Sequence, residues 1–316
     1  MPDMRKCAII GCGNVGATTA YALLQSRLLS ELLLLDINHE RAIGEAEDLG
    51  HAMPFLSPVT VRAADYPDLA DAGLIIITAG VAQRVGETRL DLLRRNAEVF
   101  HSIVESICRY NREAMLLVVT NPVDILTELT RRYSHFPARR VLGSGTVLDT
   151  ARLKFLIGRH LGLDPRQVHA FIIGEHGDSE LPVFSSANVS GIDLSHFCAH
   201  GCRDCSKEDL DALFVSARDA AYRIIRAKGA TYYAIAEAVR RIVTAILRDE
   251  QAILPVSVST EGAYGIEGLC MSLPAVIGSR GIERLPEIPL SQTEREALFH
   301  SAERIRAALD GLVLAH

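Results

Sequence analysis

The loop over residues 80–96 is the first of four polar segments that could carry chemistry in this chain of 316 residues. It joins the apolar run at 74–77 to a long helical pattern, and glycines at both ends of its first part could act as hinges. Its Gln83, Arg84 and Arg89 could reach a small anion if the loop closes over it. An active-site lid is one interpretation of this loop, and an ordinary solvated connection is the other.

The other three segments combine residue types that bind anions or move protons. Asn121 ends the apolar run at 115–120, at the edge where sites in parallel sheets open. Asp149 and Arg152 stand three residues apart in a helical pattern and therefore share one face. His176 lies between two glycines and carries an imidazole that can exchange a proton near neutral pH. Taken singly, each has a structural alternative: a turn before proline, a surface ion pair, or a loop histidine without a role.

A glycine motif near the amino terminus predicts a dinucleotide site. Gly11–Gly16 fits G-x-G-x-x-G, follows an apolar run and opens a helical pattern, and Asp36 stands twenty residues later at the end of the next run. The glycines allow a tight turn and close approach of the pyrophosphate to the helix terminus. Asp36 would bind ribose hydroxyls and repel a 2′-phosphate, so NAD is expected rather than NADP. The predicted cofactor-binding residues are Gly11, Gly13, Val15, Gly16, Asp36, Thr78, Gly80, Thr120 and Asn121.

The elements that would position these residues alternate between apolar runs and helical patterns in the first half of the chain. We expect strands at 6–10, 31–37, 74–78, 115–120 and 141–143, and helices at 17–26, 40–52, 90–110 and 123–133. This order predicts an α/β fold, a Rossmann doubly wound parallel sheet.

The second half of the chain has a different pattern, which predicts an α+β domain. Helices are expected at 146–161, 206–226, 232–248 and 291–309, with strands at 169–174, 253–282 and, unless it is irregular, 181–189. The boundary is placed so that residues 1–145 form the NAD-binding domain and residues 146–316 the catalytic and substrate domain. Helices could cross this boundary.

Composition excludes several classes of protein. The net charge is −6 and no basic cluster stands out, so neither nucleic acid nor an anionic membrane is an expected partner. No apolar segment reaches the length of a membrane span, and the amino terminus does not resemble a signal peptide. The 7 cysteines are odd in number and mostly scattered, which favours reduced thiols and a cytoplasmic location.

The order and spacing of the motifs resemble the L-lactate/malate dehydrogenase family along nearly the whole chain, and the L-lactate branch most closely. This resemblance implies NAD as the cofactor and reversible hydride transfer between NADH and pyruvate, giving L-lactate. A malate dehydrogenase or a dehydrogenase for another 2-hydroxy acid is the alternative, and a catalytically silent NAD-binding protein is a rival of another class. The matching segments are Gly11–Gly16, Gln83–Asn96, Thr120–Asp124, Gly143–Arg152, Ile172–Asp178 and Lys228–Tyr233.

The resemblance also implies a role for each polar residue. His176 would be the base that takes the hydroxyl proton, and the acid in the reverse direction. Asp149 would orient the ring, and Arg152 would hold the substrate carboxylate through a bidentate pair. Arg89, delivered by the loop, would polarise the substrate carbonyl. Asn121 would hydrogen-bond in the region of the nicotinamide ribose and the substrate oxygen.

Two positions are expected to select the substrate. Malate enzymes of the family place arginine at the position of Gln83, where it pairs with a second carboxylate; the neutral Gln83 suits the methyl group of pyruvate. Arg84 is its neighbour, so either side chain could point inward. Thr231 matches the residue behind the methyl pocket in the L-lactate branch. A small pocket there disfavours bulkier 2-oxo acids by only about 1–3 kcal/mol.

Two further features are weighed beside the catalytic residues. Lys154 and His169 match an arginine and a histidine that form a fructose 1,6-bisphosphate site across a subunit interface in bacterial relatives, and the family implies a homotetramer. Weakened activation by the sugar bisphosphate is one interpretation, and a surface lysine with a strand histidine is the other. The cluster Cys198, Cys202 and Cys205, with two histidines, resembles half of a zinc motif. Exposed or half-buried thiols are the favoured interpretation, and the predicted reaction needs no metal.

Overall fold

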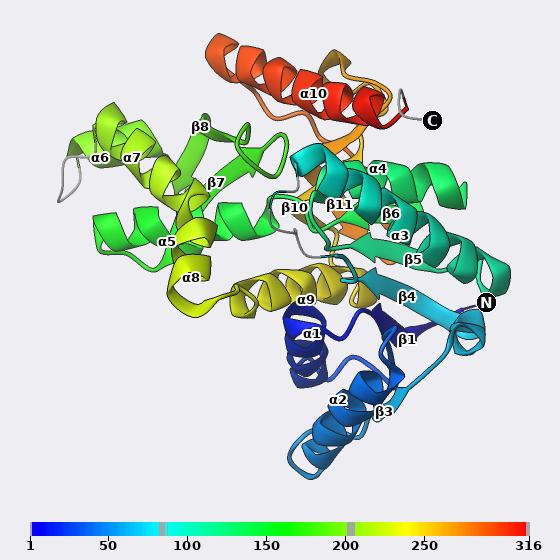
Figure 1. The fold of residues 1–316 in the computed structure, drawn as a ribbon. Coiled ribbons are helices and arrows are strands. Elements are labelled where there is room, and N and C mark those ends of the chain that lie inside the picture. Colours follow the sequence, from blue (N-terminus) through cyan, green and yellow to red (C-terminus); the bar gives the residue numbers. More distant parts are fainter. Residues whose placement is uncertain (1, 82–85, 87, 201–205, 314–316) are drawn as a thin grey trace.

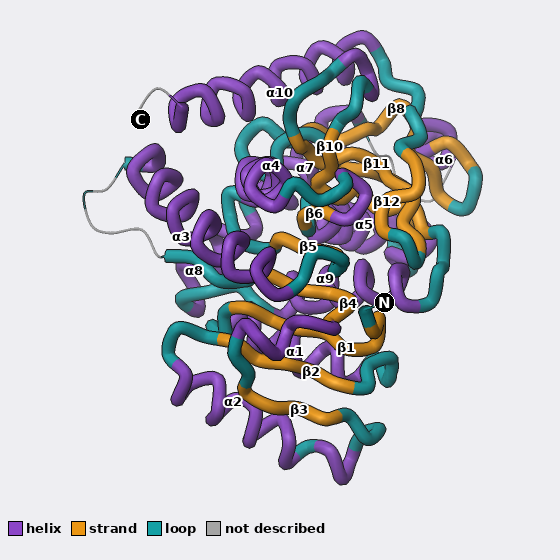
Figure 2. The backbone as a smooth tube through the Cα atoms, turned by 90° about the vertical axis from the view of Figure 1, so that its right-hand side faces the viewer, coloured by secondary structure: helices purple, strands orange, loops and turns teal. Residues whose placement is uncertain are grey.

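The computed structural model describes residues 2–81, 86, 88–200 and 206–313. Its first half is a six-stranded parallel sheet in the order β3-β2-β1-β4-β5-β6, and Figure 2 shows the first five of these strands one above another. This arrangement confirms the doubly wound parallel sheet. The elements are β1 (Asp3–Ile10), α1 (Asn14–Gln25), β2 (Glu31–Leu35), α2 (His39–His51), β3 (Thr60–Ala63), β4 (Ala72–Ile77), α3 (Arg89–Tyr110), β5 (Met115–Val118), α4 (Val123–Ser134) and β6 (Val141–Gly143).

The apolar runs form strands because both faces of this sheet are covered. All of β4 and β5 is buried, and so is β2 from Leu32 to Leu35. Strands buried on both faces read as continuous apolar runs rather than as alternating patterns. Because these strands pair in parallel, the carboxyl ends of β1, β4 and β5 meet at one edge of the sheet. The predicted residues Gly11, Thr78 and Thr120 follow these three strand ends within two residues.

The second half contains a smaller antiparallel sheet in the order β7-β8-β9, which packs with α5 and α7 around its own apolar core. Its helices are not all continuous: the single helix expected at 206–226 is two helices, α7 and α8. Residues 181–189, whose structure was left open, form a strand. The elements are α5 (Val147–Leu161), β7 (Val168–Ile173), β8 (Leu181–Val189), β9 (Ile192–Asp193), α6 (Leu194–His200), α7 (Lys207–Arg218), α8 (Ala220–Lys228) and α9 (Tyr233–Leu247).

The remaining strands return to the main sheet rather than forming a sheet of their own. β10 (Ala252–Ser259) pairs antiparallel with β6, and β11 (Cys270–Gly278) and β12 (Gly281–Arg284) follow it, so the main sheet has nine strands. α9 packs against α1, and α10 (Gln292–Val313) crosses above α3 and α4 (Figure 1). Short 3₁₀ turns lie at Met53–Phe55, Tyr66–Asp71, Ala138–Arg140, Pro165–Gln167 and Ala263–Gly265.

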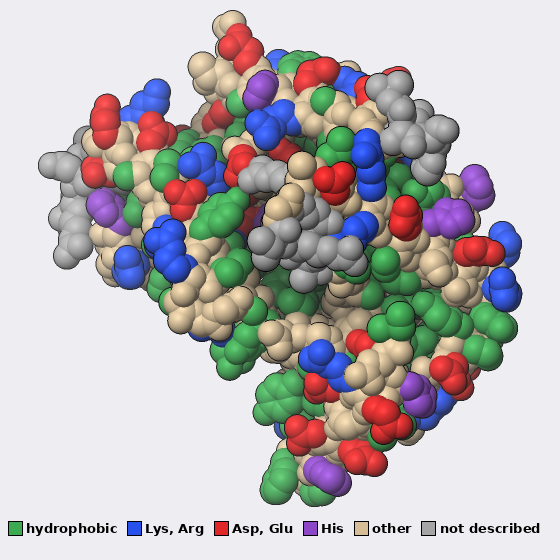
Figure 3. Space-filling model, viewed as in Figure 1, with side chains coloured by type: hydrophobic (Ala, Val, Ile, Leu, Met, Phe, Trp, Pro, Cys, Tyr) green, Lys and Arg blue, Asp and Glu red, His purple; other side chains and the backbone are tan. Residues whose placement is uncertain are grey.

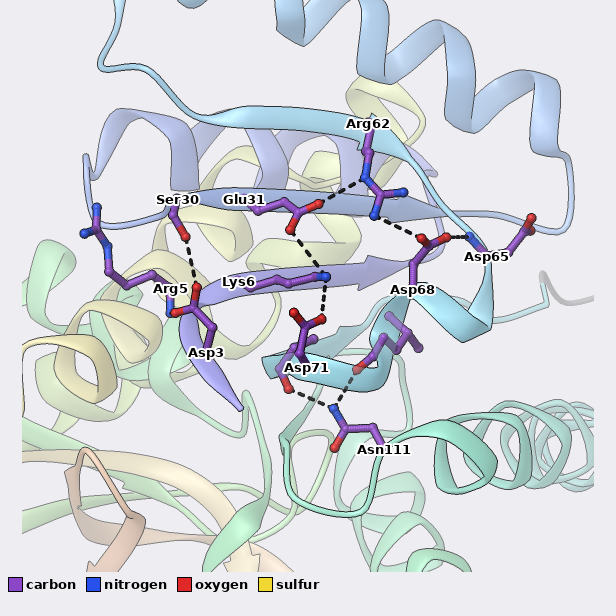
Figure 4. A network of polar contacts seen from close by, with 12 residues as sticks. Asp3, Arg5, Lys6, Ser30, Glu31, Arg62, Asp65, Asp68, Asp71 and Asn111 are labelled. Carbon is purple, nitrogen blue, oxygen red and sulfur yellow. Dashed lines mark hydrogen bonds and ion pairs between the residues drawn. The ribbon is translucent and has the colours of Figure 1, made fainter. Parts of the chain in front are cut away.

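A network of ion pairs closes the amino-terminal edge of the main sheet (Figure 4). Lys6 is 8% exposed, and its ammonium lies 2.5 Å from Asp71 and 3.3 Å from Glu31. Arg62 bridges Glu31 at 3.0 Å and Asp68 at 3.0 Å. These contacts tie β1, β2 and β3 together at the edge opposite the glycine motif. They stabilise the sheet without taking part in the site.

The surface and the helices give two further observations. Of the described helices, none is long and apolar enough to cross a membrane. On the face drawn in Figure 3, described acidic and basic side chains are interspersed.

Candidate active site

The glycine motif forms a tight turn between β1 and α1. Gly11 has φ of +103°, a conformation that favours glycine, and a Cβ there would lie 2.5 Å from the backbone nitrogen of Ala79. A Cβ on Gly16 would lie 1.8 Å from the carbonyl oxygen of Gly11, so only glycine lets the helix approach this closely. Gly13 is the N-cap of α1 and provides no side-chain cap. The first N–H groups of α1 are therefore open to a phosphate group.

Asp36 lies beside this turn, as the motif predicts. Its Oδ2 accepts a hydrogen bond of 2.7 Å from the Cys12 N–H, and its Oδ1 accepts one of 2.9 Å from the Asn38 N–H. The Ile37 side chain that follows is fully exposed and offers no positive charge. A carboxylate in this position suits two ribose hydroxyls and opposes a 2′-phosphate.

Two threonines hold the neighbouring strand ends together. The Thr78 hydroxyl donates to the Gly11 carbonyl at 2.6 Å, and the Thr120 hydroxyl donates to the Ala79 carbonyl at 2.7 Å. The structure therefore brings the glycine motif together with the ends of β4 and β5. Asn121 is exposed and lies three residues after the end of β5, just before Pro122 in a cis peptide bond.

The second group of predicted residues meets around one carboxylate. The Asp149 side chain is 3% exposed and lies in the first turn of α5. Its Oδ2 is 2.6 Å from Nδ1 of His176, and its Oδ1 accepts a hydrogen bond of 2.8 Å from Arg152. With Nδ1 occupied by Asp149, Nε2 is the ring nitrogen left for a substrate. Asp149 and Arg152 therefore form a buried ion pair rather than a surface one.

The loop that carries His176 is attached to the main sheet. Gly174 exchanges two backbone hydrogen bonds with Ser272 of β11, at 2.9 and 3.0 Å. The His176 N–H donates to Asp124 of α4 at 2.7 Å, and the Ser272 hydroxyl donates to the same carboxylate at 3.1 Å. Asp124 is 2% exposed. The loop that carries His176 is therefore fixed to the sheet that carries the glycine turn.

The charges in this site shift several pKa values. Burial lowers the pKa of His176, but the charge of Asp149 and its hydrogen bond outweigh burial and raise the pKa to about 9. Burial raises the pKa of Asp149, but His176 and Arg152 reverse this, so that the pKa is lowered overall. Burial raises the pKa of Asp124 to about 6. At neutral pH the site therefore contains an imidazolium held by a carboxylate, ready to donate a proton.

Glu180 is a site residue that sequence reasoning missed. It is 6% exposed, and a carboxyl oxygen of Glu180, a carboxyl oxygen of Asp149 and a ring nitrogen of His176 all lie within 4.8 Å of one another. Burial, and then the charge of Asp149, raise the pKa of Glu180 to about 9. The only hint in the sequence is its place directly before the apolar start of β8.

Part of the predicted site cannot be placed. Gln83 and Arg84 lie outside the described residues, and Arg89 is known only as the first residue of α3, whose N-cap is Thr88. Thr231 is half-buried in the connection between α8 and α9. The expected positions of Gln83, Arg84 and Arg89 beside the substrate and His176 therefore remain predictions.

The two side features differ in what the structure describes. Lys154 on α5 is half-buried, and burial lowers its pKa, whereas His169 on β7 is exposed. α5 packs against β7, so the two residues lie on neighbouring elements. Cys202 and Cys205 lie outside the described residues, and the side chain of Cys198 is not described, so the zinc motif is not tested. The cysteines described as free thiols are Cys7, Cys12, Cys108 and Cys270.

Comparison with known proteins places the whole chain in one group. Residues 5–143 match the NAD binding domain of lactate/malate dehydrogenase, and residues 146–313 match the alpha/beta C-terminal domain of the same family. An L-lactate dehydrogenase of Acetivibrio thermocellus is 48% identical over 310 residues, covering 98% of each chain. One from a Thermoanaerobacter species is 50% identical over 309 residues, covering 98% of this chain and 99% of the relative.

Solved structures agree with these relatives. A lactate dehydrogenase from a Medee basin deep-sea metagenome library has a TM-score of 0.96 and 42% identity, and covers 98% of both chains. A minor L-lactate dehydrogenase from Enterococcus mundtii, crystallised in a ligands-bound form, has a TM-score of 0.94 and 40% identity, with 97% of this chain and 98% of the other covered.

Proposed function

The chain belongs to the lactate/malate dehydrogenase family, and we propose that it catalyses reversible hydride transfer between NADH and pyruvate, giving L-lactate. The observation that carries this proposal is the contact of one buried carboxylate, Asp149, with both His176 and Arg152. That arrangement offers a proton donor beside an anion-binding group. His176 lies on the loop after β7, which is bonded to α4 and β11, and Arg152 lies on α5.

NAD would be held by the turn at Gly11–Gly16 and by Asp36. The open N–H groups of α1 suit its pyrophosphate, and the Asp36 carboxylate suits a ribose diol. When bound, the nicotinamide supplies or accepts the hydride. Thr78, Gly80 and Thr120 would line the path of the dinucleotide along the strand ends, together with Val15 and Asn121.

In this proposal, His176 moves the proton and Arg152 binds the acid. The imidazolium donates its Nε2 proton to the carbonyl oxygen of pyruvate, while Asp149 stabilises the charged ring and fixes the proton on Nδ1. Arg152 uses one amino group to bind Asp149, which leaves the rest of its planar fork for the substrate carboxylate. Arg89 would stabilise the negative charge that develops on the carbonyl oxygen.

The choice of pyruvate is proposed to depend on Gln83 and Thr231. A neutral Gln83 leaves no partner for a second carboxylate, which favours pyruvate over oxaloacetate. The test is NADH oxidation with pyruvate, oxaloacetate and 2-oxoisocaproate side by side. Pyruvate is expected to give the highest kcat/KM. A higher value for oxaloacetate would instead establish the malate alternative, and no turnover of any of the three would favour the silent NAD-binding protein.

We also propose a homotetramer that acts in the cytoplasm and responds weakly to fructose 1,6-bisphosphate through Lys154 and His169. Lysine contacts phosphate as a point charge without the bidentate fork of arginine, which supports weakened rather than absent activation. Titration with the sugar bisphosphate should lower the half-saturating concentration of pyruvate, and Lys154→Arg should increase the effect. An unchanged half-saturating concentration in both proteins would refute this regulation.

A further inference from the structure

Glu180 has an unusual position for an acidic side chain. It stands between the loop of His176 and the first residue of β8, and it is 6% exposed. Its Oε1 atom is buried and has no hydrogen-bond partner among the described residues. A buried carboxylate without partners is costly, and the neutral acid is much less so. The surroundings therefore favour a protonated Glu180.

The same carboxyl group is close enough to sense the charge of the catalytic pair. One of its oxygens lies within 4.8 Å of a His176 ring nitrogen and of an Asp149 oxygen. At this separation two charges in a protein interior interact strongly. Glu180 and His176 act on each other. The other charged and titratable groups that act on one or both of them are Asp149 and Arg152 from α5, Asp124 from α4 and Arg218 from α7.

These groups act in opposite directions on Glu180. Asp149 opposes the loss of its proton, whereas His176, Arg152 and Arg218 favour it. Burial and Asp149 prevail, so Glu180 keeps its proton at neutral pH. When that proton is lost at higher pH, a new negative charge appears beside the imidazolium. The two protons therefore leave as a coupled pair rather than independently.

We propose that Glu180 is a positioning residue that acts through His176: it is neutral while pyruvate binds at physiological pH, and its ionisation in alkaline solution holds the imidazole in the charged form. This inference rests on the proposed function, because it assumes that pyruvate requires the imidazolium. Glu180 would thus extend the pH range of pyruvate reduction upward without touching the substrate.

The test is the pH dependence of kcat/KM for pyruvate in the wild type and in Glu180→Gln. Glutamine has the shape of the neutral acid and cannot ionise. At pH 6.5 the variant should retain kcat/KM within about threefold of the wild type, because Glu180 is neutral there. Its alkaline limb should move to lower pH by about one unit, the size of effect expected from a nearby charge. Glu237→Gln, at an exposed position of α9, is the matched control and should leave the profile unchanged.

A second measurement does not depend on catalysis or on the variant's activity. Infrared difference spectra of the wild type between pH 7 and pH 10 should show the loss of a protonated carboxyl band, and Glu180→Gln should lack that band. An unchanged alkaline limb in a folded variant, or the same band in both proteins, would overturn the proposal for Glu180. No pyruvate reduction by the wild type would refute the proposed function itself, which is a distinct result.

Discussion

The contact between Asp149 and His176 gives the sharpest test of the proposed chemistry. The Asp149→Asn substitution keeps the shape of the side chain and removes its charge. Nδ1 of His176 lies 2.6 Å from the carboxylate, and this charge is what raises the imidazole pKa to about 9 against burial. Loss of an opposite charge at such a distance changes a pKa by about 1–3 units. We therefore expect the His176 pKa to fall to between about 6 and 8.

The magnitude follows from the free energy of that shift. Each pKa unit corresponds to about 1.4 kcal/mol, so the imidazolium loses about 1.4–4 kcal/mol of stabilisation. If the charged ring is needed for the reaction, kcat/KM for pyruvate should fall with the protonated fraction of His176. The loss should be up to about 10-fold at pH 7 and about 10- to 1000-fold at pH 10, where the ring is mostly deprotonated in both proteins. The protonated form of His176 is the active one in this mechanism, and the pKa of His176 is raised in the folded protein. Pyruvate reduction by the wild type should therefore decline as pH rises through about 9. In the variant the same decline should begin at lower pH.

The assay is NADH oxidation from pH 5.5 to 10, with NADH affinity measured by fluorescence. Affinity should be unchanged, because the side-chain contacts of Asp149 go to His176 and Arg152 and not to the glycine turn. Asp164→Asn is the matched control, because this aspartate pairs with Arg166 at an exposed position. A folded Asp149→Asn enzyme with an unshifted profile and less than threefold loss would refute the assigned role of the carboxylate.

Four other substitutions test three separate parts of the molecule. Gln83→Arg should move the kcat/KM preference from pyruvate toward oxaloacetate, and an unchanged ratio would mean that this side chain does not face the substrate. Asp36→Ser should raise the KM for NADH and narrow the preference for NADH over NADPH, because the carboxylate at the ribose is lost. Lys6→Met should lower the free energy of unfolding by about 1–2 kcal/mol in urea titrations at pH 7, because Glu31 and Asp71 lose their buried cation. Asp71→Asn should cost less, since that side chain is 65% exposed.

Much of the first half could be predicted because its physics is local. A strand buried on both faces needs an apolar run, and β2, β4 and β5 are such runs. β3 was missed because its four residues, Thr60–Ala63, are exposed or half-buried and contain an arginine, so no apolar run marks them. The glycine turn was predictable because its steric requirements admit no other residue at Gly11 and Gly16.

The second half depends more on contacts between distant segments. The antiparallel strands after residue 252 were predicted, but their pairing partner was not, because β6 offers only a three-residue edge. The helix expected at 206–226 divides at Asp219, where no glycine or proline marks a break. At this break the Arg218 guanidinium lies over the Phe214 ring and donates a hydrogen bond to the Asp219 carboxylate. These contacts do not explain why the helix divides there.

The candidate site divides in the same way. Sequence alone supplied the residue types, and the family resemblance supplied their roles, but neither could show that Asp149 contacts both His176 and Arg152. Glu180 was not predicted as a site residue, because a glutamate that follows polar residues in a loop resembles a surface residue. Its burial arises only when the loop between β7 and β8, which carries both His176 and Glu180, folds against Asp149 of α5.

Under the proposed function, the shared Asp149 carboxylate would connect substrate binding with proton transfer. Oδ2 of Asp149 contacts His176, the proposed proton donor, and Oδ1 contacts Arg152, the proposed partner of the substrate carboxylate. Because both contacts start from one rigid group on α5, the imidazole and the guanidinium keep a fixed separation. In the proposed mechanism, a substrate bound to Arg152 would present its neighbouring carbonyl to His176 already oriented, which is how such sites lower the entropic part of a barrier. It follows that substitutions at Asp149 and Arg152 should not have additive effects, since each disturbs the group on which the other depends.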